Sequence, residues 1–125
     1  MAQSTETLPN GLQLLQDDRF CKLGQDSVLL SAFAKPRRNA KLLDLGCGTG
    51  ALALLVWRPD LKITGLELQD GPLDLFRQSI AANDLENVTA LQGDLRQMRT
   101  LLPHGSMDYV ICNPPYFDQI GRAHV

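Results

Sequence analysis

The sequence is poor in several features that would point to particular classes of protein. Its three cysteines, Cys21, Cys47 and Cys112, form no CxxC pair and are odd in number, which argues against a disulfide framework or a zinc site and for a reducing compartment. The longest apolar run, 51–57, is far too short to span a bilayer. The first residues also lack the basic start and apolar stretch of a signal peptide. We therefore expect a cytoplasmic protein with no membrane contact and no metal.

The size and charge of the chain indicate an ordinary globular domain. Its 125 residues suit a single domain, and the net charge of −2 gives no general reason to expect a polyanionic partner. One short stretch differs, because seven residues contain the four cations Lys35, Arg37, Arg38 and Lys41. Such runs mostly form solvated loops, and a nucleic-acid contact is the alternative.

The N-terminal 40 residues show weaker patterns than the rest. Residues 1–10 are expected to be a loose end, and 12–16 a short strand. A helix is expected over 27–34, with Asp26 or Ser27 as its N-cap, because a side-chain oxygen there satisfies a free backbone N–H. This helix should end before Pro36.

From residue 41 onwards, strands and helices alternate. Four short runs with buried character predict strands at 41–45, 62–68, 88–92 and 107–112. Helices are expected between them, at 51–57, from Asp70 (as cap) to about Asn83, and over 95–102. This alternation predicts an α/β fold with a parallel sheet and right-handed crossovers. Ligands of such sheets bind beyond the carboxyl ends of the strands.

A glycine-rich turn follows the first of these strands. It reads DLGCGTGA, places glycines at 46, 48 and 50, and also fits the dinucleotide fingerprint, which tolerates alanine last. Asp44 favours a methionine-derived cofactor over a dinucleotide. Its carboxylate can accept a hydrogen bond from the ammonium group of such a cofactor and would repel a pyrophosphate. Glu67 closes the next strand and suits the ribose hydroxyls of either cofactor.

A third acid, Asp94, follows the strand at 88–92. It can accept a hydrogen bond from an adenine amino group. Acids at the ends of three successive parallel strands are expected to line one edge of one cleft.

Four motifs together carry a family resemblance. The set DLGCGTG, GLEL, GDL and NPPY, in this order, resembles S-adenosylmethionine-dependent methyltransferases that modify planar amino groups. With the segment at 20–34, the chain is similar to bacterial tRNA adenine-N6 methyltransferases that act beside the anticodon of a valine tRNA. The resemblance implies a Rossmann-like class I methyltransferase fold, truncated after about the fourth strand. It also implies S-adenosylmethionine held by Asp44, Gly46, Gly48, Gly50, Glu67, Asp94 and Asn113, and a tRNA substrate.

The NPPY motif, at 113–116, is expected to prepare the adenine amine for methyl transfer. An adenine amine is a poor nucleophile because its lone pair is delocalised into the ring. The Asn113 side chain and the Pro114 carbonyl can accept its two hydrogens and free the lone pair, and Pro115 restricts the residue before it. Tyr116 can stack on the base. The methyl donor needs no metal, so catalysis rests on positioning.

The domain boundaries follow from these motifs. Residues 1–40 form an N-terminal extension with a short strand and a helix, 41–119 a partial methyltransferase domain, and 120–125 a tail that matches an in-frame sequencing adapter. The fourth strand would then form an open edge. We expect the 125-residue polypeptide to be marginally stable or insoluble and to have little activity. A cooperative melt together with methyl transfer by this polypeptide alone would contradict this. The full-length protein is expected to be a monomer.

Several other functions are compatible with parts of the pattern. A glutamine methyltransferase acting on release factors uses the same NPPY motif, and a guanine-N2 rRNA methyltransferase is a third member of this class. A nicotinamide-dependent oxidoreductase would use the glycine turn and Glu67, but it gives NPPY no role. A non-catalytic binding module is the last alternative.

Overall fold

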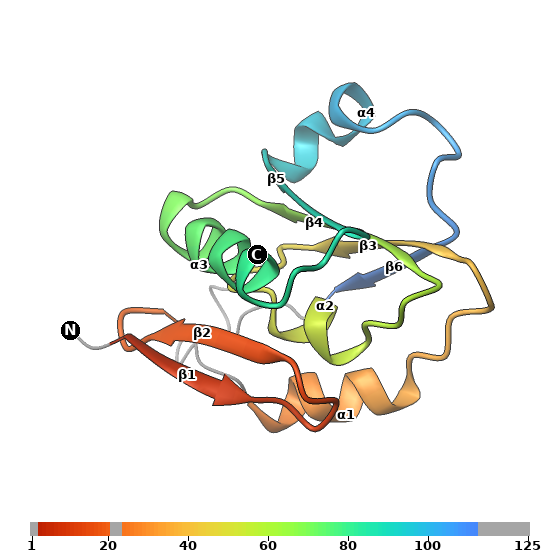
Figure 1. Ribbon diagram of the computed structural model, residues 1–125. Helices are drawn as coiled ribbons and strands as arrows, with labels where there is room; N and C mark the ends of the chain where they lie inside the picture. Colours follow the sequence, from red (N-terminus) through yellow and green to blue (C-terminus); the bar gives the residue numbers. More distant parts are fainter. Residues whose placement is uncertain (1–2, 21–23, 113–125) are drawn as a thin grey trace.

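A four-stranded parallel sheet organises the molecule. The computed structural model describes residues 3–20 and 24–112, and its sheet has the order β5-β4-β3-β6 (Figure 1). The four strands are β3 (Lys41–Leu45), β4 (Lys62–Glu67), β5 (Val88–Gln92) and β6 (Tyr109–Cys112). The order reverses at β3, with β4 and β5 on one side and β6 on the other, so the topological switch point lies between β3 and β6. The predicted parallel α/β fold is confirmed.

Helices cover both faces of this sheet. On one side lie α1 (Gln25–Phe33), α2 (Ala51–Leu55) and α3 (Asp70–Ala82), and on the other the 3-10 helix η1 (Leu95–Gln97) runs into α4 (Met98–Leu101) (Figure 1). No helix within 3–20 or 24–112 has the length and apolar character needed to cross a membrane.

The predicted helix caps were wrong. Gly24 and Gln69, both in extended conformation, precede α1 and α3, and neither caps its helix with a side chain. Asp26 and Asp70 instead lie in the first turn, where a carboxylate is favourable to the helix dipole. The helix predicted over 51–57 ends early at Leu55, and the Trp57 indole N–H donates to Asn87 Oδ1 at 2.8 Å.

The N-terminal segment is not the loose end that its sequence suggested. Residues Gln3–Thr7 form β1, which pairs antiparallel with β2 (Gln13–Asp17). Two side chains, one in α3 and one directly after it, bind the outer edge of β2: Ser79 Oγ accepts from Leu15 N at 2.9 Å, and Asn83 Oδ1 accepts from Gln13 N at 2.8 Å. The hairpin therefore packs on α3 as part of the main body (Figure 1).

Phe76 of α3 links the core to the glycine turn. Its side chain is fully buried. A Cβ added at Gly50 would lie 2.1 Å from Phe76 Cδ1, and one added at Gly65 would lie 2.5 Å from Phe76 Cε2. Two glycines, one in the turn and one in β4, therefore let this ring pack between them.

Candidate active site

The predicted acids come together at the carboxyl edge of the sheet. Asp44 pairs in register with Gly65, and Glu67 pairs with Gln92, two residues before Asp94. On the other side of β3, Leu45 pairs with Cys112, the last residue of β6. Because the strands are parallel, all four chain segments leave the sheet at one edge. The expected cleft edge is thus formed by β3, β4, β5 and β6.

Asp44 is the most unusual group at this edge. Its side chain is 1% exposed, and its Oδ2 atom has no hydrogen-bond partner among the described residues. Burial raises the pKa of its carboxyl from 3.8 to about 7; a backbone hydrogen bond with Ala53 lowers it, and the Glu67 charge raises it further. Buried acceptors are normally satisfied, so this one points to a ligand that donates to it. A cationic donor would favour the carboxylate form.

Glu67 fixes the glycine turn to β4. Its Oε1 accepts from Gly48 N at 2.8 Å, and its Oε2 accepts from Gln69 N at 2.9 Å. Cys47 N also donates to Leu66 O at 3.0 Å. Two carboxylate oxygens offer about four acceptor positions, so Glu67 keeps acceptor capacity for hydroxyl groups while it holds the turn.

The three glycines of the turn have different surroundings. Gly46, Gly48 and Gly50 all have positive φ, of 63°, 57° and 89°. At Gly46 and Gly48 an added Cβ would meet nothing within 4 Å, whereas at Gly50 it would collide with Phe76. Space for a ligand therefore exists at the first two positions, and the third is a packing position.

Asp94 has a structural role that the sequence did not reveal. It is the N-cap of η1, accepting from Arg96 N at 2.9 Å, and it pairs with the Arg96 guanidinium at 2.6 Å. The Arg96 side chain and then its backbone N–H lower the pKa of Asp94 to about 2. The Asp94 carboxyl is thus ionised, and the amino group of an adenine would share this carboxylate with Arg96.

Two exposed leucines were missed by the sequence reasoning. Leu68 directly follows Glu67 and is 59% exposed, and Leu95 directly follows Asp94 and is 58% exposed. They leave neighbouring strands at the same edge, so they offer apolar surface beside the acids. The sequence did contain a signal for this apolar surface, because a leucine directly follows both Glu67 and Asp94.

The remaining predicted residues, Asn113, Pro114, Pro115 and Tyr116, lie outside the described residues. Their position in the chain is still informative, because Cys112 ends β6 beside Leu45. Cys112 also lies close enough to Asp44 for the carboxylate to raise the pKa of its thiol, after the larger effect of burial. The tail at 120–125 also lies outside the described part.

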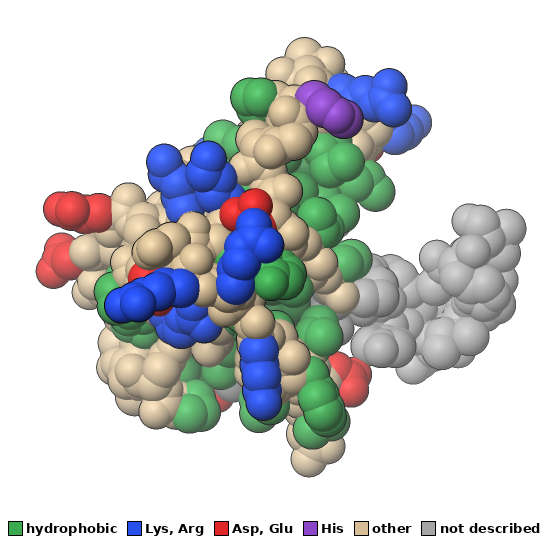
Figure 2. Space-filling model, turned by 90° about the vertical axis from the view of Figure 1, so that its right-hand side faces the viewer, with side chains coloured by type: hydrophobic (Ala, Val, Ile, Leu, Met, Phe, Trp, Pro, Cys, Tyr) green, Lys and Arg blue, Asp and Glu red, His purple; other side chains and the backbone are tan. Residues whose placement is uncertain are grey.

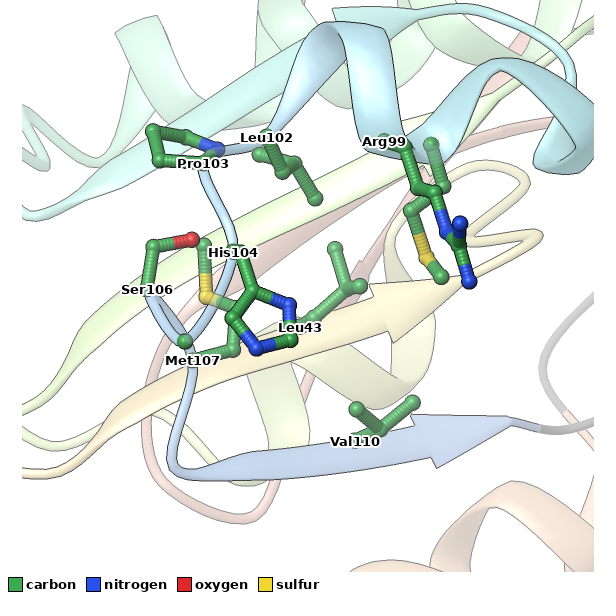
Figure 3. Close-up of a pocket in the computed structure, with 10 residues that line it drawn as sticks. Leu43, Arg99, Leu102, Pro103, His104, Ser106, Met107 and Val110 are labelled. Atoms are coloured by element: carbon green, nitrogen blue, oxygen red, sulfur yellow. The ribbon is translucent and has the colours of Figure 1, made fainter.

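A pocket elsewhere on the sheet is distinct from this edge. It has a cavity volume of about 220 Å³ and lies between β3, β6 and the segment 98–107. Figure 3 shows Leu43 and Val110 on the two strands, with Leu102, Pro103, His104 and Met107 nearby. His104 lies in a turn between α4 and β6. The lining is mostly apolar and includes no predicted site residue. Within the described segments, no cluster of His, Cys, Asp or Glu could hold a metal ion.

Solved structures define the class of fold. A 16S rRNA N2 G1207 methyltransferase from Thermus thermophilus, solved with AdoMet and guanosine, superposes with a TM-score of 0.72. The alignment covers 94% of this chain and 34% of that one, at 22% identity. TrmN from the same organism gives a TM-score of 0.58 over 78% of this chain and 29% of that one, at 24% identity. The chain has the Rossmann-like fold of class I methyltransferases.

The family follows from sequence comparison. The chain belongs to the methyltransferase small domain family, whose model matches residues 20–124. A tRNA1(Val) (adenine(37)-N6)-methyltransferase of Shewanella sp. is 36% identical over 115 residues, which is 87% of this chain and 48% of that protein. The enzyme of the same name from Pseudoalteromonas translucida is 36% identical over 99 residues, 78% of this chain and 41% of that protein. The chain therefore spans less than half the length of these relatives.

Proposed function

We propose that this chain is the cofactor-binding part of an S-adenosylmethionine-dependent methyltransferase that modifies the N6 amine of an adenine in tRNA. The observation that carries the proposal is the unpartnered, buried Oδ2 of Asp44 beside the open glycine turn. A nicotinamide cofactor has no ammonium group to satisfy this atom, whereas the amino-acid end of S-adenosylmethionine does. Family membership supports the same cofactor.

The described residues fit this cofactor group by group. Asp44 accepts from its ammonium, and the turn at Gly46 and Gly48 gives room for close approach. Glu67 accepts from the ribose hydroxyls. Leu68 and Leu95 supply apolar surface for the adenine, whose amine donates to Asp94. When bound, S-adenosylmethionine supplies a sulfonium methyl as electrophile, which needs no metal.

The chain prepares the nucleophile through the segment that follows β6. The Asn113 carboxamide oxygen and the Pro114 carbonyl accept the two hydrogens of the substrate amine. Pro115 restricts the Pro114 backbone, so this carbonyl is held in place. Tyr116 stacks on the base, which is worth about 1–3 kcal/mol. An anticodon-loop adenine is single-stranded, so presenting it costs little unstacking energy.

The adenine of a tRNA is the substrate favoured by the curated relatives, whose names specify it. Guanine N2 of rRNA is the second candidate, because the rRNA methyltransferase from Thermus thermophilus covers 94% of this chain with a TM-score of 0.72. Both bases present a planar exocyclic amine to the same motif. Mass spectrometry of nucleosides separates the candidates, after the longest product of the gene is incubated with unmodified tRNA, rRNA and labelled cofactor.

Replacement of Asn113 tests the catalytic assignment. We expect Asn113→Ala in that longest gene product to lower the transfer rate at least about 100-fold, the scale for one lost donor or acceptor in the transition state. Cofactor affinity should change little, because Asn113 acts mainly on the substrate amine. Titration calorimetry with S-adenosylmethionine and a transfer assay measure the two effects. A variant that transfers methyl groups at the normal rate would remove Asn113 from the mechanism.

A further inference from the structure

The amino edge of the sheet, opposite the candidate active site, carries half of the chain's Lys and Arg residues. Six of the 12 come from two segments, 35–41 and 58–62: Lys35, Arg37, Arg38, Lys41, Arg58 and Lys62. The strand register explains why segments distant in sequence meet here, since Lys41 pairs with Lys62. Figure 2 looks onto this edge and shows Lys and Arg side chains spread across it.

Two of these cations form ion pairs with acidic residues of the described part of the chain. Arg37 pairs with Asp108 at 3.0 Å, and Arg58 pairs with Asp60 at 2.8 Å. Among the described residues, the other four, Lys35, Arg38, Lys41 and Lys62, have no carboxylate partner. The chain as a whole has a net charge of −2, so positive charge is concentrated at this edge. Asp84 and Glu86, which precede β5, place negative charge at one end of this edge.

We call this surface, formed by residues 35–41 and 58–62, the basic edge, and hydrogen bonds hold it in a fixed arrangement. Arg58 donates from Nη1 to Pro36 O at 2.9 Å, and Asn39 N donates to Asp60 Oδ2 at 2.9 Å. Lys41 N donates to Asp108 Oδ2 at 2.8 Å. These contacts tie the loop at 36–40 to the starts of β4 and β6. The free cations therefore have a preorganised backbone under them, unlike those of a mobile charged loop.

An exposed aromatic ring lies next to these cations in the chain. Phe33 ends α1, two residues before Lys35, and is 80% exposed. Figure 1 shows α1 running towards the amino ends of the strands. Aromatic faces beside cations are the combination that binds unpaired nucleotides, through stacking and phosphate contacts.

We propose that this basic edge contacts the sugar–phosphate backbone of the RNA substrate, at a place separate from the catalytic edge; the inference rests on the proposed function. Strand β3 has five residues, so the two edges lie roughly 15 Å apart at about 3.3 Å per residue. A folded RNA extends well beyond this distance and can reach both edges. Phosphate contacts of this kind give affinity and register without reading sequence.

A charge-reversal experiment tests the basic edge. Binding of a fluorescent, unmodified tRNA transcript to the longest product of the gene is followed by anisotropy over a salt series. We expect Lys41→Glu with Lys62→Glu to weaken binding at least about tenfold and to reduce the slope of log K against log salt by about 1–2. The matched control, Arg77→Glu with Arg99→Glu, changes the same charge at exposed positions elsewhere and should weaken binding less than about threefold.

Unchanged RNA binding by the Lys41/Lys62 variant would overturn the inference, and so would an equal loss of RNA binding in both variants. Binding of each variant to phosphatidylserine vesicles is measured in parallel. A Lys41/Lys62 variant that loses vesicle binding but keeps RNA binding would also overturn the inference. The last outcome would make the surface a membrane contact. Parallel calorimetry with S-adenosylmethionine separates the inference from the proposed function. Failure of the unsubstituted longest gene product to bind cofactor would defeat the proposed function, whereas its RNA binding would still test the basic edge.

Discussion

Asp44→Asn is expected to weaken S-adenosylmethionine binding while making the folded protein more stable. The variant keeps the size of the side chain but loses the charge that accepts from the ammonium group. Hydrogen bonds to charged groups contribute about 1.5–3 kcal/mol, so affinity should fall about 10–100-fold. Titration calorimetry at pH 8, where the carboxyl of the unmodified protein is largely ionised, measures this loss.

The stability gain follows from the pKa of the Asp44 carboxyl. Burial raises it from 3.8 to about 7, so the folded protein binds this proton more tightly than the unfolded chain. Stability therefore falls as pH rises between these values. Asn does not titrate, so its advantage should grow by about 3 kcal/mol from pH 5 to pH 8, because about two pKa units of the shift fall in this window at 1.36 kcal/mol per unit. Denaturant titrations at both pH values measure it.

A matched control is available on α3. Asp74→Asn removes the same charge at an exposed position, where the side chain accepts a hydrogen bond from Gln78. It should leave cofactor affinity unchanged, because Asp74 lies on α3 and outside the carboxyl edge of the sheet. An Asp44→Asn protein that binds cofactor normally would rule out Asp44 as the ammonium acceptor. A loss of stability at pH 8 would show that the buried carboxylate is well satisfied.

Alanine substitutions in the glycine turn are expected to separate stability from binding. At Gly50, where φ is 89°, the new Cβ would lie 2.1 Å from Phe76 Cδ1. The left-handed conformation costs about 1–2 kcal/mol, and overpacking costs about 1–3 kcal/mol. Gly50→Ala should therefore lose about 2–5 kcal/mol of unfolding free energy, a large part of a typical domain's stability. Thermal and denaturant unfolding measure it.

Gly48→Ala is the matched comparison. Its φ is also positive, at 57°, but its Cβ would meet nothing within 4 Å. Its stability loss should stay near the backbone cost of about 1–2 kcal/mol, while the methyl group projects into space assigned to the cofactor and weakens binding. Phe76→Leu should recover part of the loss in the Gly50→Ala protein. Equal stability losses at both positions, with no recovery, would contradict the packing role of Gly50.

The sequence predicted which residues form the candidate site, but not the burial, pairing or pKa of their side chains. Strand-ending acids and a glycine turn are local patterns, so Asp44, Glu67 and Asp94 were predicted at one edge, and the register places them there. That Asp44 is buried and Asp94 paired with Arg96 depends on how neighbouring elements pack. Burial and pairing give these two aspartates opposite pKa shifts.

The sequence alone determined the alternation of strands and helices, because apolar periodicity and glycine or proline breaks act over a few residues. Only the tertiary structure decided that 3–7 is a strand, since all of its side chains are exposed and its partner β2 is held by Ser79 and Asn83, which are 64 and 70 positions from the residues they bind. The same holds for the basic edge, which exists because Lys41 and Lys62 start adjacent parallel strands. Such contacts join residues that no short window of sequence contains, so the packing of the whole chain decides them.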